Sequence, residues 1–197
     1  QEGLLGGSFF AIDGCKMSSN ASKEWSGKIS DLQKRKQKIE SKLKGLVEDH
    51  IEIDKEEHAV KEKISASGEK QIKRLEQQAA KVEKWLREND KKIGVNKKEL
   101  HSNVTDNDSA KMHTAHGTVQ GYNGQAIVDS KHQVIVHGEA IGKGLDNDNL
   151  PPVVDGAKEN LESIGKGADY FEGKILTADS SYHSVTNINK CNEEKLD

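Results

Sequence analysis

Short apolar runs that close on an acid mark two strands of this chain. Residues 9–12 are apolar and are followed by Asp13, which predicts a short buried strand ending on a carboxylate. Residues 174–179, KILTAD, have the same form and end on Asp179. Burying a carboxylate is costly unless a positive group or a metal ion neutralises its charge, so the position of both aspartates needs an explanation.

After Gly117 the chain changes to the two-residue period of strands. Residues 122–129 and 132–140 predict two strands, and Ser130 and Lys131 between them predict a tight turn. We therefore expect an antiparallel hairpin in this part of the chain.

Two helices are expected around the last strand. Residues 146–164 have a helical pattern, with Pro151 and Pro152 in or just before the first turn, where proline is tolerated. Ser184 is the expected cap of a closing helix that runs to about Glu194. Strands and helices in this order indicate an α/β sandwich with a mixed sheet.

Residues 23–99 have a helical composition of their own, without proline and rich in good helix formers. Apolar residues recur there at steps of three and four, with Lys36 at one seam position. The two series are Ile29, Leu32, Ile39, Leu43 and Leu46, continued by Val60 and Ile64, and then Ile72, Leu75, Ala79, Val82, Leu86 and Ile93.

We interpret this segment as a helical hairpin whose chain reverses at one of two weak points. One is residues 65–68, SASG, where Ser67 would cap the second helix. The other is residues 54–57, where charge crowds and the apolar seam lapses. Set against the rest of the chain, the hairpin interrupts an α/β core after its first strand, so we expect a core at 1–22 and 111–197 and an insertion with its linker at 23–110.

Composition supports a division into two parts. Only 32% of the 197 residues are hydrophobic and 4% are aromatic, which is thin for one compact core. Residues 23–99 hold 21 basic and 16 acidic side chains, whereas the remainder holds 9 basic and 17 acidic ones. The segment is a solvated spacer, a dimerising coiled coil, or a surface whose lysines and arginines meet nucleic-acid phosphates.

The cellular setting follows from what the sequence contains. Cys15 and Cys191 have no metal-type spacing, which favours a reducing, cytoplasmic location. No stretch approaches the ~20 apolar residues needed to cross a membrane. The chain starts without methionine and stops just after a helical pattern, so we expect a piece of a longer protein.

The two strand-ending acids suggest a metal site if the fold brings them together. Ligands gather at the crevice beyond strand ends in α/β sheets, and two carboxylates there repel unless a cation lies between them. Oxygen-only ligation by Asp13 and Asp179 suits Mg²⁺ or Mn²⁺, and two such ions about 4 Å apart serve phosphodiester chemistry. The alternative is that both aspartates cap turns.

Three segments in this order resemble one protein family. DGCKMSSNAS, GYNGQAIVDSKHQVIV and LTADSSYHS, with NKCNEE shortly after, are similar to the catalytic domain of insertion-sequence transposases of the Asp-Asp-Glu (DDE) type. The subgroup resembled carries a helical insertion after the first strand. The resemblance implies an RNase H-like fold, two divalent ions, cleavage of DNA at the element's ends, and transfer of the freed 3′-hydroxyl to target DNA.

The resemblance also assigns roles to residues. Asp13 matches the first acid and Asp179 the second, whereas Glu193 and Glu194 match the family's Cys-x-Glu-Glu segment and not its catalytic glutamate. That glutamate lies well downstream of the second aspartate in such proteins, so we name no third ligand and expect this chain alone to be inactive.

Three residues near the two aspartates are candidate DNA contacts. Lys16, just past Asp13, is a candidate contact to a DNA phosphate or a plain surface lysine. Tyr182 and His183 follow Asp179 closely and are candidate DNA contacts, although Tyr182 would serve equally well to pack the turn.

Two further aspartates have ordinary structural explanations, and two alternative functions remain. Asp146 is expected at a helix start and Asp129 at a hairpin turn, both ordinary places for an aspartate. A non-enzymatic helical-hairpin interaction protein, which would self-associate, and a metal-dependent nuclease of the same fold remain the alternatives to a transposase.

Overall fold

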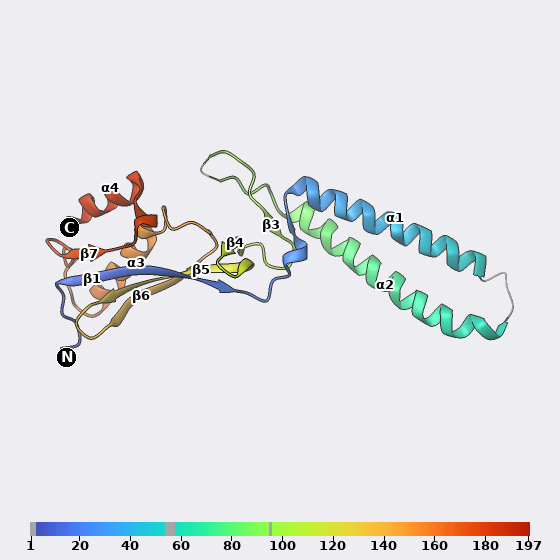
Figure 1. Ribbon diagram of the computed structural model, residues 1–197, viewed down its shortest axis with the longest axis horizontal. Helices are drawn as coiled ribbons and strands as arrows, with labels where there is room; N and C mark the ends of the chain where they lie inside the picture. Colours follow the sequence, from blue (N-terminus) through green and yellow to red (C-terminus); the bar gives the residue numbers. More distant parts are fainter. Residues whose placement is uncertain (1–2, 54–57, 95) are drawn as a thin grey trace. The chain divides into compact units, whose positions relative to one another are not determined.

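The computed structural model describes residues 3–53, 58–94 and 96–197, which fall into two compact units. Unit 1 comprises Gln1–Ala21 and Ser109–Asp197, and unit 2 comprises Ser22–Asp108. Unit 1 contains a five-stranded sheet and helices α3 and α4, and unit 2 contains helices α1 and α2 (Figure 1). The protein is therefore a mixed α/β structure, and the unit bounds lie close to the division expected from the sequence.

The sheet of unit 1 is mixed. Its order is β4-β5-β1-β7, and β6 also pairs with β5. The strands are β1 (Phe9–Ser18), β4 (Ala110–Thr114), β5 (Gly117–Asp129), β6 (Val134–Ile141) and β7 (Ile175–Thr177). Among the described strands, β1 and β7 form the one parallel pair, and the others pair antiparallel.

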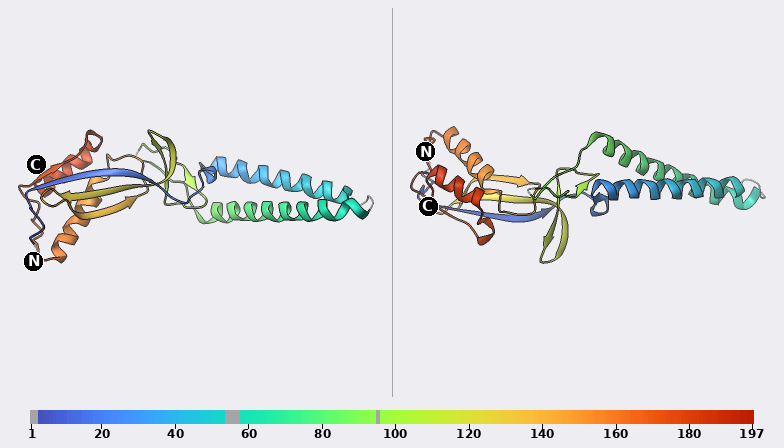
Figure 2. Two further views of the ribbon diagram at one scale, coloured as in Figure 1. Left: turned by 60° about the horizontal axis from the view of Figure 1, so that its bottom comes forward. Right: turned by 90° about the horizontal axis from the view of Figure 1, so that it is seen from above.

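Alternation along β1 separates the two faces of the sheet. Phe10 and Ile12 are 0% and 2% exposed and pack into the core, whereas Phe9 is 43% exposed on the opposite face. The core face is covered by α3, which contacts β5 and β6, and α4 packs on α3 (Figure 2). Burying each large apolar side chain here contributes about 1.5–3 kcal/mol. The α3 contribution to this core consists of Leu150, Val153, Val154, Ala157 and Leu161.

Strand β1 is longer than the apolar pattern predicts. It continues past Asp13 to Ser18 and pairs with β5 as far as Ser18 opposite Gly121, so the expectation that the strand ends on Asp13 is wrong. The extra residues are polar or small, and their backbone groups bond across the ladder whatever their side chains are. A prediction based on apolar residues therefore stops too early.

The β5–β6 hairpin is confirmed, but its turn is not the two-residue turn expected. β5 ends at Asp129 and β6 begins at Val134, so the connection has four residues. Gln133 takes the left-handed conformation that closes it, with φ of 54°. Strand β4, which pairs with the start of β5, is not among the strands expected from the sequence, because its alternation is short, with Ala110 and Met112 separated by Lys111.

Both helices of unit 1 exist, with a correction to the first. Helix α3 is Leu150–Ser163, with prolines in its first turn, so Asp146 lies before the helix and not in its first turn. Helix α4 is Val185–Glu194, and Ser184 caps it by accepting a hydrogen bond from the Asn187 backbone N–H at 3.2 Å, as the sequence predicts.

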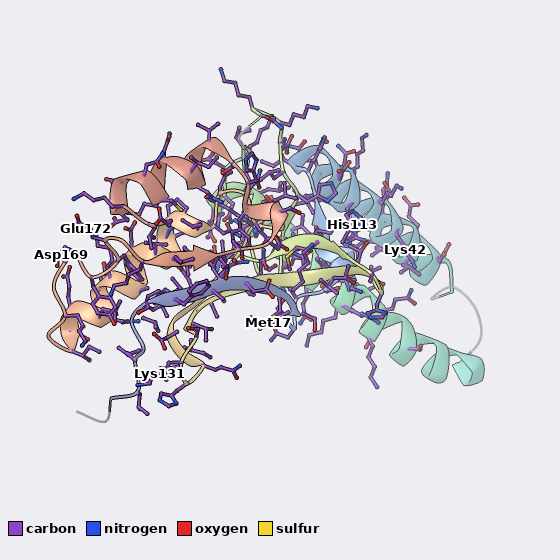
Figure 3. The ribbon with its side chains drawn as sticks, turned by 60° about the vertical axis from the view of Figure 1, so that its left-hand side comes forward. Met17, Lys42, His113, Lys131, Asp169 and Glu172 are labelled. Atoms are coloured by element: carbon purple, nitrogen blue, oxygen red, sulfur yellow. The ribbon has the colours of Figure 1, made fainter. Side chains whose placement is uncertain are left out.

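Asp129 does more than occupy a turn. Its carboxylate is fully buried and accepts hydrogen bonds from the backbone N–H groups of Gly6 at 2.9 Å, Gly7 at 2.8 Å and Lys131 at 2.9 Å. Lys131 also donates from its Nζ to the Gly3 carbonyl at 3.2 Å, beside the N-terminal segment (Figure 3). Burial opposes ionisation of Asp129, but the three amides outweigh it and lower its pKa. The expected turn residue is therefore an anchor for the N-terminal segment.

In unit 2, α1 (Ile29–Ile53) and α2 (His58–Glu88) pack side by side and run in opposite directions (Figure 1). Residues 65–68 lie inside α2, so the helix break with Ser67 as its cap is wrong. The other proposed reversal, residues 54–57, lies outside the described residues. No helix in the described part of the chain combines the length and the apolar character needed to cross a membrane.

The core of unit 2 lies at one end of the helix pair. Leu32, Val82, Trp85 and Val104 are buried together, next to the small ladder of β2 (Ser26–Gly27) and β3 (Ser102–Asn103). The helical series is correct for Leu32 and Val82 but wrong for Ile93, which follows the end of α2 and is 57% exposed. Lys36, the polar seam residue, reaches Glu83 of the other helix at 3.3 Å. Such a cross-helix pair favours one register of the two helices.

Candidate metal-binding site

Asp13 lies where β1 loses its parallel neighbour. The pairing of β1 with β7 ends at Ala11 opposite Thr177, two residues before Asp13. The carboxylate of Asp13 is exposed and accepts a hydrogen bond from the Gly14 backbone N–H at 2.7 Å. By strand alternation Asp13 faces away from Phe10 and Ile12, toward the sheet face that the helices leave open.

Asp179 follows the last paired residue of β7 by two positions, as Asp13 follows the last β1 residue that pairs with β7. It follows Thr177 by two residues and is the N-terminal cap of the short helix η2 (Ser180–Tyr182). Its Oδ1 accepts from the Ser181 hydroxyl and from the Ser181 backbone N–H, the latter at 2.7 Å. These bonds, the hydroxyl first, hold the pKa of Asp179 below its ordinary value. Asp179 thus caps a turn, as the alternative interpretation expects, and it follows the parallel ladder of β1 and β7 by the same two residues as Asp13.

Tyr182 is a buried residue whose pKa is affected by the carboxylates of Asp13, Asp146 and Asp179. It is only 4% exposed, and its hydroxyl donates to the Oε1 of Gln125. Its pKa is raised first by burial and then by the negative charges of Asp146, Asp13 and Asp179. Three carboxylates from β1, from the loop before α3 and from the end of β7 therefore lie within electrostatic reach of one buried hydroxyl.

Asp146 is the member of this group that the sequence analysis missed. Its Oδ1 accepts from Asn123 Nδ2 at 2.6 Å and from Gln125 Nε2 at 2.9 Å. A sequence signal existed: these two amides occupy alternate positions of one strand, on the face that is otherwise buried. Buried amides require partners, and an acid elsewhere in the chain is a natural one.

The other candidate site residues differ in accessibility. Lys16 is exposed, and its Nζ donates to the His113 carbonyl at 3.0 Å. His183 is exposed at the end of η2. Tyr182 is buried against Gln125, which is the packing role that the sequence left open and which keeps its ring away from solvent. Of the three, Lys16 and His183 are accessible to a ligand at the surface.

A shallow hollow of about 460 Å³ lies on the open face of the sheet beside Asp13. Its floor crosses three strands and is made of small residues, and Glu139 stands on β6 at its far side. The small residues are Gly14, Gly124, Ala126, Gly138 and Ala140. Met17 and Gln125 also line the hollow, and their side chains fill the space over Gly124 and Gly14.

The arrangement of metal-ligating side chains limits the kind of site that this region could form. Within residues 3–53, 58–94 and 96–197, no set of three or more His, Cys, Asp or Glu side chains is close enough to hold a metal ion. A site here would therefore use the two carboxylates Asp13 and Asp179, with water completing the shell. That donor set fits Mg²⁺, which keeps several waters and takes one or two carboxylates.

Glu194 is occupied elsewhere. Its carboxylate accepts from Lys158 Nζ of α3 and from Lys190 Nζ of α4, both at 2.7 Å, and Lys190 also reaches Asp155 at 2.6 Å. Burial opposes ionisation of Glu194, yet these bonds lower its pKa overall. Glu194 therefore joins helices α3 and α4 through its two lysine partners.

Known proteins do not identify this chain. A scan against protein-family models, a search of curated proteins and a search of solved structures each found no match.

Proposed function

We propose that this chain is the catalytic-domain segment of a DDE transposase of the insertion-sequence type, with an RNase H-like core interrupted by the unit 2 hairpin. The observation that carries the proposal is the parallel register of β1 and β7, in which Ala11 and Thr177 are paired and each is followed two residues later by an aspartate. The chemistry of the two aspartates and the resemblance of the three sequence segments support the same conclusion.

The residues would act as follows. Asp13 and Asp179 would hold divalent cations, Mg²⁺ or Mn²⁺, which when bound supply an activated water or hydroxyl and charge stabilisation for the leaving oxygen. Ser181 holds Asp179 in place, and the Gly14 amide holds Asp13. Lys16 and His183 are exposed close to these acids in sequence and would contact DNA phosphates at the rim.

The test is DNA cleavage by a protein that carries this chain together with the third acid. Asp13→Asn and Asp179→Asn should each abolish Mg²⁺-dependent cleavage of element ends while the protein stays folded. Asp169→Asn, at an exposed position away from both acids in the sequence, should cleave like the wild type. Cleavage retained in either of the first two variants contradicts the assignment, and cleavage without joining to target DNA would identify a nuclease instead.

A further inference from the structure

Asp146 joins three parts of unit 1 through its two carboxylate oxygens. It lies half-buried in the loop between β6 and α3. Oδ1 accepts from Asn123 Nδ2 and Gln125 Nε2 of β5, and Oδ2 accepts from the Ser181 hydroxyl of η2 at 3.2 Å. An ionised carboxylate accepts and never donates, so each of these partners must present a proton to it.

The first route from Asp146 to Asp179 runs through Ser181. The Ser181 hydroxyl lies within hydrogen-bond distance of both carboxylates, and the Ser181 backbone N–H donates to Asp179 at 2.7 Å. A hydroxyl has one proton, so it donates to one carboxylate at a time. Asp146 and Asp179 thus share one residue, and the position of that residue depends on both.

The second route runs through Gln125. Asp146 accepts a hydrogen bond from Gln125 Nε2, so the Gln125 amide must point its Oε1 the other way. That Oε1 accepts a hydrogen bond from the Tyr182 hydroxyl. Gln125 and Tyr182 are 2% and 4% exposed, so leaving either unpaired is costly. Asp146 therefore fixes η2 at two adjacent residues, Ser181 directly and Tyr182 through Gln125.

We propose that Asp146 is a positioning residue: it holds η2 against β5 and thereby holds the Asp179 side chain in one rotamer at the end of β7. It touches Asp179 only through other residues, so its role is geometric and does not need its charge at the metal. Asn in its place keeps an oxygen for the amides of β5 and an NH₂ group facing Ser181, whose proton then goes to Asp179. Ala keeps neither.

The experiment measures the Asp179 side-chain rotamer by three-bond NMR couplings to its carboxyl carbon in the 197-residue chain. The wild type should show one rotamer, and Asp146→Ala should shift the couplings toward the average over staggered wells. Asp146→Asn should stay close to the wild type. Asp148→Ala, a half-buried position in the same loop, is the matched control and should leave the couplings unchanged.

A second measurement, Mn²⁺ affinity, rests on the proposed function. Loss of an outer-shell partner typically weakens metal binding by about tenfold or more, so Asp146→Ala should show that loss and Asp146→Asn should not. If the wild type binds no Mn²⁺, the proposed function is wrong. The NMR couplings of Asp179 would then still decide whether Asp146 holds its rotamer.

Two results overturn the positioning role. One is a folded Asp146→Ala chain whose Asp179 couplings match the wild type. The other is an Asp146→Asn chain that is as impaired as Asp146→Ala in its couplings, which would mean that charge and not geometry is what Asp146 supplies. Should Asp146→Ala not fold, Asp146→Ser, which is also too short to reach Ser181, replaces it with the same expected result.

Discussion

Ala11 of β1 and Thr177 of β7 are paired in the parallel ladder, and each is followed two residues later by an aspartate, Asp13 and Asp179. Paired strands lie about 4.8 Å apart, and both aspartates follow the end of this ladder by the same number of residues. The pKa of Tyr182 is raised by burial and then by the charges of Asp146, Asp13 and Asp179. The proposed metal chemistry depends on the carboxylates of Asp13 and Asp179 lying close enough to share a cation.

Replacing Asp129 should release the N-terminal segment. Asp129→Asn loses the charge to which Gly6, Gly7 and Lys131 donate and puts an NH₂ group against their amides. We expect a loss of about 2 kcal/mol in the free energy of unfolding, measured by chemical denaturation. The exposed Asp169→Asn should stay within about 0.5 kcal/mol of the wild type.

The Asp129 effect should also depend on pH. The folded-state pKa lies below the ordinary value of about 3.9, so the carboxylate adds stability above that value and loses it as the pH falls through the folded pKa. The difference between the wild type and Asp129→Asn should therefore be full at pH 6 and shrink in acid. A difference that grows in acid would contradict the anchoring role.

Glu194 should matter far more than its neighbour Glu193. Glu194 is nearly buried between Lys158 and Lys190, whereas the Glu193 side chain is 73% exposed and 3.9 Å from Lys190. Glu194→Gln removes the negative charge and turns an NH₂ group toward one of the two lysines, so it should cost about 2 kcal/mol in unfolding free energy. Glu193→Gln should cost less than about 0.5 kcal/mol, and equal losses in the two variants would argue against the interhelix role.

Leu32 should anchor the core of unit 2. It is 1% exposed and packs with Val82 and Trp85 at one end of the helix pair. Leu32→Ala should destabilise this unit by about 2–5 kcal/mol in thermal or denaturant unfolding. Val47→Ala, at a position that is 39% exposed on the same helix, is the matched control and should be close to neutral. An unaffected Leu32→Ala protein would mean that the helices are held together elsewhere.

A gain in stability is expected at Gly45. It lies inside α1, and a β-carbon added there would meet nothing within 4 Å. Alanine is the better helix former by about 0.8–1 kcal/mol, so Gly45→Ala should raise the unfolding free energy of unit 2 by up to that amount. Loss of stability on this substitution would show that something packs against that face of α1.

Sequence patterns predict the elements of this fold better than their ends. The apolar run at residues 9–12 locates β1, but the polar residues after Asp13 extend the strand by backbone pairing alone, which no apolar pattern records. Ser184 is predictable as a cap because its chemistry is local. The SASG segment at 65–68 is misleading because Gly within a helix costs only about 1 kcal/mol and Ser less, which a 31-residue helix tolerates.

The candidate site is predictable only in part, for the same physical reason. Asp13 and Asp179 attract notice because each follows an apolar run, and their relation then depends on strand pairing over a long sequence separation. Asp146 lies before a helix, which has an ordinary local explanation. Its actual partners, Asn123, Gln125 and Ser181, come from two distant segments and become visible only in three dimensions.

The most direct test is Mn²⁺ titration of the 197-residue chain, followed by paramagnetic broadening of backbone amide signals. Gly14 and Ser181, whose amides bond to the two acids, should broaden first. Asp13→Asn and Asp179→Asn should each weaken this binding by more than about tenfold, because each removes one of two carboxylate ligands. Broadening that centres on another part of the chain, or that persists unchanged in both variants, would contradict the claim that these two aspartates form one cation site.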